Sequence, residues 1–177
     1  MDYLLATSDC SYDVIVLTET WLNDSTLSRQ IFGPDYEVLR CDRSIFNSSK
    51  SSGGGVLIAT RRGLNVRILN DNSSKNVEQL WAEIKLDTVT LYLCVVYFPP
   101  DRSSDASLIE CHLGSVRKVL EVASPSDEII VLGDFNLPHI KWTESQHGFL
   151  FADPQSSRIH SNAANLLDGY SKPLCNR

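Results

Sequence analysis

The stretch Glu128-Ile129-Ile130-Val131-Leu132-Gly133-Asp134-Phe135-Asn136 decides the fold of this chain. Its four consecutive apolar residues, mostly β-branched, are typical of a strand that is buried on both faces. Gly133 allows a sharp turn or a close approach of the backbone to a ligand. Asp134 and Asn136 lie two positions apart, so on an extended segment both side chains can project to the same side. Because Asp and Asn are also common in turns, spacing alone favours an ordinary strand-to-turn transition over a phosphate or water site.

The rest of the sequence predicts a strand-rich domain with few helices. Residues 13–17 form a second apolar, β-branched run, which ends beside Glu19. Four further strands are expected over 56–60, 65–69, 79–86 and 89–97, and the third of them is expected to expose one face to solvent. Residues 108–120 repeat apolar side chains at three- and four-residue steps, which predicts an amphipathic helix capped by Ser104 or Asp105. A closing helix is expected around 159–167. This order of elements favours two packed sheets with helices outside them.

The glycines Gly53-Gly54-Gly55 allow two interpretations. A glycine-rich loop can cradle a phosphate, but a strand follows these glycines and no Lys-Ser/Thr pair completes a phosphate-binding loop. We therefore interpret them as a flexible lead into the strand. His112 falls on the apolar edge of the predicted helix and is expected to be packed, whereas His139 and His147 match no catalytic pattern.

Length and composition fit one soluble globular domain over residues 1–177, with 42% hydrophobic and 21% charged residues. The net charge of −6 argues against holding nucleic acid by bulk electrostatics, although a divalent cation could reverse the local sign. The five cysteines form no Cys-x-x-Cys pair, so we expect a reducing compartment and no zinc site. No run resembles a membrane span or a signal peptide. We expect an intracellular protein, nuclear or cytoplasmic, that is not secreted and has no membrane partner.

Four segments taken in chain order carry a family resemblance. They are Val16-Leu17-Thr18-Glu19-Thr20-Trp21-Leu22, Gly53-Gly54-Gly55-Val56-Leu57-Ile58, Val96-Tyr97-Phe98-Pro99-Pro100 and Gly133-Asp134-Phe135-Asn136. Together they resemble the endonuclease/exonuclease/phosphatase superfamily, and most of all the apurinic-endonuclease-like domain of non-LTR (LINE-type) retrotransposons. The resemblance implies an α/β (α+β) fold, the four-layered DNase I-like sandwich. It covers residues 12–142, so the sandwich is expected to be incomplete, without its first strand and its C-terminal strands.

The resemblance also implies roles for four residues. Glu19 would be the metal ligand, for Mg²⁺ or alternatively Mn²⁺, and no small-molecule cofactor is implied. Asp134 would orient or deprotonate the attacking water, Asn136 would donate its amide to a phosphate oxygen, and the Tyr97 hydroxyl would lie near the scissile phosphate of a DNA substrate. All four follow strand ends, so we expect them to converge on one rim of the sandwich. Glu19 and Asp134 should then raise each other's pKa unless a cation or donor lies between them.

The sequence also departs from the family pattern. The Ser-Asp-His triplet of the family, whose Asp polarises a catalytic His, does not occur in the 177 residues. Three hypotheses therefore stay open: a Mg²⁺-dependent retrotransposon-derived DNA endonuclease domain, an inactive remnant of one, or a phosphatase or phosphodiesterase of the same superfamily. Two motifs, Glu19-Thr20-Trp21-Leu22 and Gly133-Asp134-Phe135-Asn136-Leu137-Pro138, favour the retrotransposon branch. We expect an endonuclease-type domain by descent, with little turnover and poor solubility.

Overall fold

The computed structural model describes residues 12–44, 47, 50, 52–69, 76–103, 105–137, 141–144 and 150–153. The expected closing helix and the residues His139 and His147 lie outside these ranges. The chain divides into two compact units. The first comprises Met1–Tyr97 and Ser126–Asp134, and the second comprises Phe98–Pro125 and Phe135–Arg177.

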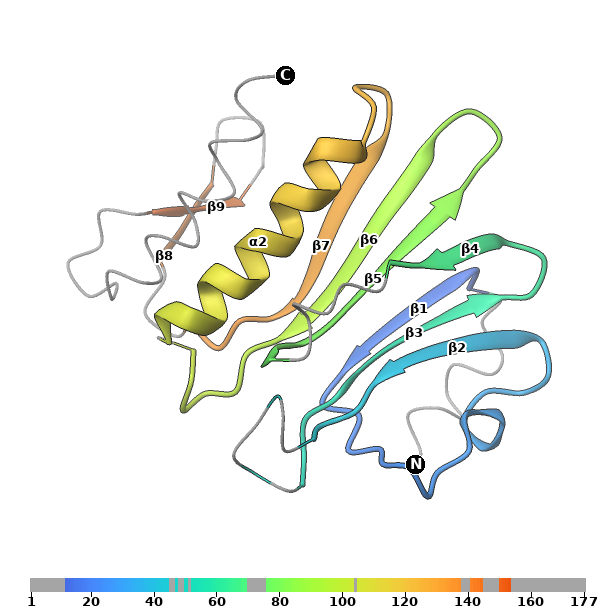
Figure 1. Ribbon diagram of the computed structural model, residues 1–177, viewed down its shortest axis with the longest axis horizontal. Coiled ribbons are helices and arrows are strands. Elements are labelled where there is room, and N and C mark those ends of the chain that lie inside the picture. Colours follow the sequence, from blue (N-terminus) through green and yellow to red (C-terminus); the bar gives the residue numbers. More distant parts are fainter. Residues whose placement is uncertain are drawn as a thin grey trace. The chain divides into compact units, whose positions relative to one another are not determined.

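Two sheets make up the first unit (Figure 1). In one, β3 (Val56–Arg61) lies between β1 (Val14–Thr18) and β2 (Tyr36–Cys41) and is antiparallel to both. The other has the order β4-β5-β6-β7, formed by Asn65–Ile68, Glu78–Lys85, Thr90–Tyr97 and Glu128–Asp134. Its first three strands are antiparallel, and β7 is parallel to β6. A short 3-10 helix, η1 (Ser28–Gln30), precedes β2.

The core of this unit follows from the alternation of side chains along β3. Val56 and Ile58 are fully buried in a cluster with residues of β5 and β6, namely Ala82, Ile84, Leu93, Val95 and Tyr97. Leu57 and Ala59 point to the opposite face, where they pack with Phe32 from the segment before β2. Burying each large aliphatic side chain contributes roughly 1.5–3 kcal/mol, so these two clusters join the sheets and cover the outer face of the first one.

The sequence predicts that β7 (Glu128–Asp134) is buried on both faces, and this prediction is wrong. Ile130 and Leu132 of β7 are 41% and 40% exposed. Only one face of β7 is covered: Ile129 and Val131 are half-buried, whereas Glu128, Ile130 and Leu132 on the other face are exposed. β7 is also an edge strand, paired only with β6 among the described strands. β6, which lies between β5 and β7, is buried over its last six residues. The prediction that the strand over 79–86 has one solvent-exposed face is also wrong. This strand, β5, is buried along most of its length, and only Lys85 at its end is exposed.

The second unit contains α2 (Ala106–Val122) and a two-stranded antiparallel sheet of β8 (Lys141–Glu144) and β9 (Leu150–Asp153). Asp105 caps α2 by accepting hydrogen bonds from the backbone N–H groups of Ser107 and Leu108, as one of the two expected caps. The hydrogen bond from the Ser107 hydroxyl, followed by those from Arg102 and the two backbone N–H groups, lowers the pKa of Asp105 to about 2. Within the described part of the chain, no helix has the length and hydropathy to span a membrane.

Candidate active site

Backbone strain marks the candidate site. Among the described residues other than glycine, three have a positive φ: Glu19 (53°), Trp21 (57°) and Asn136 (46°). This left-handed conformation costs a residue with a side chain roughly 1–2 kcal/mol. Such strain persists where the surrounding structure enforces it, and it gathers at functional sites. Two of the three residues are candidates from the sequence, and the third is the neighbour of one of them.

The three glycines ahead of β3 hold the loop that carries Glu19. Gly54 donates its N–H to Glu19 Oε2 at 3.0 Å, and its carbonyl accepts the N–H of Trp21 at 2.9 Å. Gly53, Gly54 and Gly55 all have positive φ, from 63° to 85°. A Cβ on Gly54 would run into the Arg43 guanidinium and the Glu78 carboxylate. The interpretation of these glycines as a flexible lead is therefore wrong: they let three chain segments approach one another.

The Glu19 carboxylate is held by hydrogen-bond donors on several sides. The Trp21 indole N–H donates to Oε2 at 2.8 Å, beside the Gly54 N–H, and the Tyr97 hydroxyl bonds to the same carboxylate. Burial acts to raise the pKa of Glu19, but the bonds from Tyr97, Gly54 and Trp21, with the charge of Arg43, outweigh it and lower the pKa. Glu19 is thus ionised at neutral pH. The rise in the pKa of Glu19 that was expected unless a cation or donor lies between Glu19 and Asp134 therefore does not occur.

Tyr97 connects this carboxylate to a buried ion pair. Burial and then the contact with Glu19 raise the pKa of Tyr97 to about 12, although Arg43 acts in the opposite direction. The hydroxyl is therefore protonated, and a donor, at neutral pH. The Arg43 guanidinium carbon lies 5.7 Å from the centre of the Tyr97 ring. Arg43 Nε pairs with Glu78 Oε1 at 2.7 Å, and the other carboxylate oxygen of Glu78 accepts the N–H of Gly55 at 2.5 Å.

Asp134 ends β7 directly opposite Tyr97 in the parallel pairing of β6 and β7. Its side chain is exposed. One residue earlier, Gly133 stands opposite Val96 with a φ of 150°, and a Cβ at this position would collide with the Val96 carbonyl. Glycine is thus required for the backbone to deliver Asp134 beside Tyr97. The structure brings Glu19, Tyr97 and Asp134 to one end of the first unit.

Asn136 belongs to the second unit, in which its side-chain amide donates to the Phe98 carbonyl at 2.7 Å. The ring of Phe98 lies 5.5 Å from that of Phe135 and 5.7 Å from the imidazole of His112, both edge to face. His112 is fully buried, and this burial lowers its pKa to about 4. It is therefore a neutral packed residue at physiological pH, as the sequence predicts.

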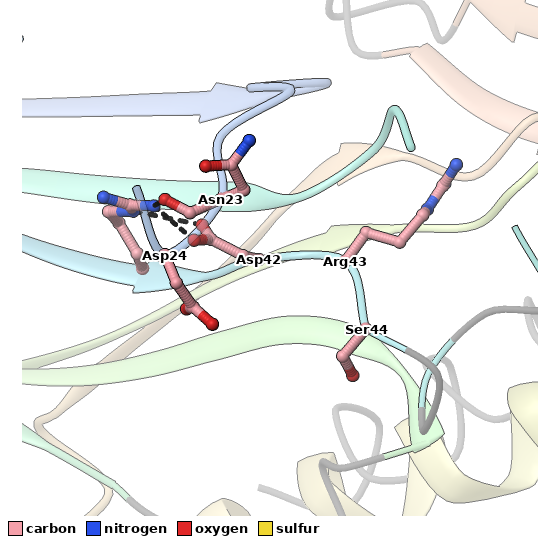
Figure 2. Close-up of a pocket in the computed structure, with 6 residues that line it drawn as sticks. Asn23, Asp24, Asp42, Arg43 and Ser44 are labelled. Atoms are coloured by element: carbon pink, nitrogen blue, oxygen red, sulfur yellow. Dashed lines mark hydrogen bonds and ion pairs between the residues drawn. The ribbon is translucent and has the colours of Figure 1, made fainter. Parts of the chain in front are cut away.

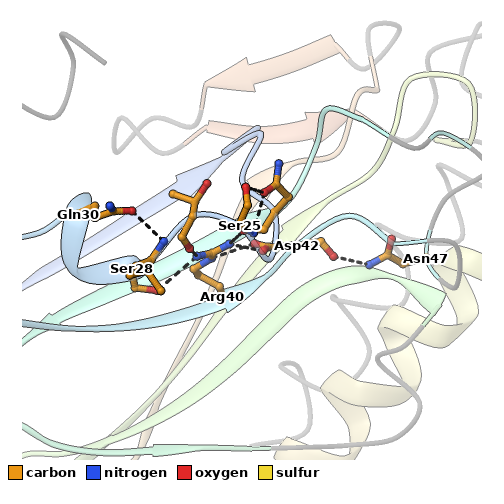
Figure 3. A network of polar contacts seen from close by, with 9 residues as sticks. Ser25, Ser28, Gln30, Arg40, Asp42 and Asn47 are labelled. Atoms are coloured by element: carbon orange, nitrogen blue, oxygen red, sulfur yellow. Dashed lines mark hydrogen bonds and ion pairs between the residues drawn. The ribbon is translucent and has the colours of Figure 1, made fainter.

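A cavity of about 310 Å³ opens next to the loop between β1 and β2 and shares Arg43 with the site (Figure 2). Asn23, Asp24, Arg40, Asp42, Arg43 and Ser44 line it. Arg40 is committed to the protein: it forms an ion pair with Asp42 and donates to the carbonyls of Thr26 and Asn23 at 2.6 and 2.9 Å (Figure 3). Since two arginines and two carboxylates balance in charge, this cavity carries no net charge for a phosphate.

Sequence reasoning missed Arg43, Glu78 and the clamping role of Trp21. Nothing local marks either charged residue, because the strand of Glu78 also carries the polar residues Gln79, Glu83 and Lys85. Among the described residues, no group of three or more His, Cys, Asp or Glu side chains is placed to hold a metal ion. Any cation at this site would rest on Glu19 and few other protein ligands.

Comparison with known proteins identifies the fold family. Residues 2–159 match the sequence profile described as the endonuclease/exonuclease/phosphatase family. The chain belongs to this family. This endonuclease/exonuclease/phosphatase domain has no match among curated proteins.

Solved structures agree with this assignment of the fold. The endonuclease domain of TRAS1, a telomere-specific non-LTR retrotransposon, is 13% identical with a TM-score of 0.59, over 96% of this chain and 64% of that one. An AP endonuclease from Archaeoglobus fulgidus is 12% identical with a TM-score of 0.57, over 96% and 63%. The 3′ phosphatase NExo from Neisseria, bound to a product DNA hairpin, is 15% identical with a TM-score of 0.57, over 97% and 65%. The chain therefore spans slightly less than two thirds of each of these proteins, and it has an incomplete DNase I-like α/β fold.

Proposed function

We propose that this site belongs to a DNA endonuclease of non-LTR retrotransposon descent, which hydrolyses phosphodiester bonds with the help of a divalent cation. One observation carries the proposal: an ionised Glu19 is fixed by three donors, one of which is Tyr97, and Asp134 stands directly opposite Tyr97 on the next strand. Strained residues gather at active sites, where a preorganised group can position the reacting atoms.

The donor set of Glu19 suits Mg²⁺. An ionised carboxylate has about four acceptor positions, and Trp21, Gly54 and Tyr97 occupy three of them. Mg²⁺ keeps several waters and binds through one or two carboxylates together with substrate phosphates, whereas zinc sites need three or four protein ligands. Mn²⁺ prefers the same oxygen ligands. When bound, such a cation neutralises charge that develops on the phosphate.

The chain's own residues would perform the remaining tasks. The exposed Asp134 carboxylate would orient or deprotonate the attacking water. The Tyr97 hydroxyl, whose single O–H is bonded to Glu19, would lie near the scissile phosphate and hold that carboxylate in place. The family resemblance further assigns the side-chain amide of Asn136, which bonds to the Phe98 carbonyl within the second unit, to a phosphate oxygen.

DNA as substrate is supported by the similar TRAS1 endonuclease domain and AP endonuclease, and by the DNA product bound to the similar 3′ phosphatase. The Glu-Thr-Trp-Leu and Gly-Asp-Phe-Asn-Leu-Pro segments support the retrotransposon branch over a phosphatase. We further propose that the 177-residue chain turns over slowly, because it contains no Ser-Asp-His triplet. Loss of one preorganised transition-state donor typically costs about 10²–10³ in rate.

The test combines cation binding with DNA nicking. Mn²⁺ binding, followed by electron paramagnetic resonance, should weaken at least about tenfold in Glu19→Gln and stay unchanged in Glu83→Gln, another carboxylate of the first unit. Equal Mn²⁺ binding by all three proteins would refute the cation site. Nicking of supercoiled and abasic plasmid with Mg²⁺ should be faint and lower still in Asp134→Ala. Robust Mg²⁺-dependent nicking that disappears in Asp134→Ala would support the endonuclease and refute the slow turnover.

A further inference from the structure

Trp21 exposes most of a large aromatic ring immediately beside the Glu19 carboxylate. Its side chain is 68% exposed, more than any other described large hydrophobic residue. Its backbone is held in the left-handed region at a φ of 57°, so the structure maintains this exposure against a conformational cost. Only the indole N–H of Trp21 is needed to hold Glu19. The rest of the ring serves no such purpose and faces solvent.

The ring is fixed although it is exposed. Its Nε1 donates to Glu19 Oε2 at 2.8 Å, and its backbone N–H donates to the Gly54 carbonyl at 2.9 Å. The Cε2 and Cζ2 atoms pass close to Gly53, where a Cβ would lie 3.7 Å from each of them. A side chain that is already immobilised loses little conformational entropy when a ligand covers it. The Trp21 ring is therefore preorganised to stack against a planar ligand.

The charge of the chain indicates what that partner is. With a net charge of −6, bulk electrostatic attraction cannot supply most of the affinity for a nucleic acid. Stacking of bases on aromatic side chains is the other main source of affinity for unpaired strands, and it tolerates any base because each has a π-face. A fixed indole next to the carboxylate that faces the phosphate supplies this contact.

We propose that the Trp21 indole is a stacking platform for an unpaired nucleobase adjacent to the phosphate bound at Glu19. This inference rests on the proposed function and adds to it a subsite for the base. Trp21 then has two separate tasks: its N–H positions Glu19, and its face binds the base. Two substitutions separate them, since Trp21→Phe keeps a flat ring without the N–H and Trp21→Ala removes both.

The experiment measures binding of a phosphorothioate oligothymidylate, which resists hydrolysis, and of an abasic strand of the same length, both with Mg²⁺. Compared with Trp21→Phe, which also lacks the indole N–H, Trp21→Ala should bind oligothymidylate roughly 5- to 100-fold more weakly, whereas the two variants should bind the abasic strand equally. Trp21→Phe should keep most of the affinity, because the ring remains. The slope of affinity against salt should be the same in all variants, since no phosphate contact is removed. Tyr12→Ala, which removes another exposed aromatic ring at the opposite end of β1, should bind as the wild type does.

Tryptophan fluorescence gives a second measurement. The chain has three tryptophans, of which Trp81 is only 4% exposed. Oligothymidylate should quench the emission of the wild type, and the difference from Trp21→Phe isolates the part due to Trp21. Unchanged oligothymidylate binding by Trp21→Ala would overturn the platform, as would an equal loss for the abasic strand, which would assign Trp21 to Glu19 alone.

The outcomes also separate this inference from the proposed function. If Glu19→Gln abolishes cation binding while Trp21→Ala binds oligothymidylate normally, the platform is wrong and the proposed function stands. If Trp21 binds the base but Glu19→Gln leaves cation binding unchanged, the proposed function is wrong and the stacking subsite stands.

Discussion

The buried pair of Arg43 and Glu78 provides the sharpest test of how the site is supported. The Glu78 side chain is fully buried and that of Arg43 is 6% exposed. In Glu78→Gln, the amide oxygen can still accept the Gly55 N–H, but the amide NH₂ would face the N–H groups of Arg43. The substitution therefore leaves a buried guanidinium without its counter-charge while changing almost no volume.

The expected loss is large. Breaking a buried ion pair by removing one partner costs about 3–5 kcal/mol, because the remaining charge stays desolvated. Domains are typically stable by only about 5–15 kcal/mol, so this loss amounts to roughly a fifth of the stability or more. For a chain of this length, each kcal/mol shifts the melting temperature by roughly 2–4 °C. The shift expected for Glu78→Gln is accordingly about 6–20 °C downward.

The free energy of unfolding of Glu78→Gln and of the wild type is measured by urea titration, with circular dichroism as the signal. Glu83→Gln on the same strand is the matched control. The Glu83 side chain is 5% exposed, nearly as buried as that of Glu78, but its partner Arg67 is 68% exposed. Because Arg67 can return to water, the control should lose less than about 1 kcal/mol. Equal losses in both variants would refute the argument. The double variant Arg43→Met/Glu78→Gln removes the unpaired charge and should recover much of the stability, and a further loss would count against the reasoning.

Two further predictions concern pH and solubility. The pKa of Tyr97 is about 12 in the folded chain against 10.0 normally, so its stabilising contribution is complete below pH 10 and disappears as the pH rises towards 12. This two-unit shift in pKa corresponds to at most ~2.7 kcal/mol of stability. Between pH 10 and 12, the urea midpoint of Tyr97→Phe should therefore fall less steeply than that of the wild type. Identical slopes in the two proteins would disprove the prediction. The exposed Ile130 and Leu132 on the edge strand β7 should make the isolated chain prone to aggregate, and replacing both with Thr should raise its solubility. Equal solubility of the wild type and this double variant would contradict this expectation.

The sequence alone determined the elements and the chain positions of the candidate residues. Strands and the helix follow from short-range periodicity, and all four predicted strands between 56 and 97 occur close to their expected bounds. Asp105 was one of two predicted caps, and His112 was predicted to be packed. Strand ends can be read locally, which is why Glu19, Tyr97, Asp134 and Asn136 were expected together at the rim of a sandwich. The structure brings the first three to one end of the first unit.

Only the tertiary structure decided how these residues are held. Gly54 and Glu19 are 35 positions apart, as are Arg43 and Glu78, and no local pattern specifies which distant groups will meet. Burial of β7 was overestimated for the same reason: an apolar run shows that a strand can be covered, but its place in the sheet determines whether it is. The lowered pKa of Glu19 likewise depends on donors from three separate segments, which come together only when the two sheets pack.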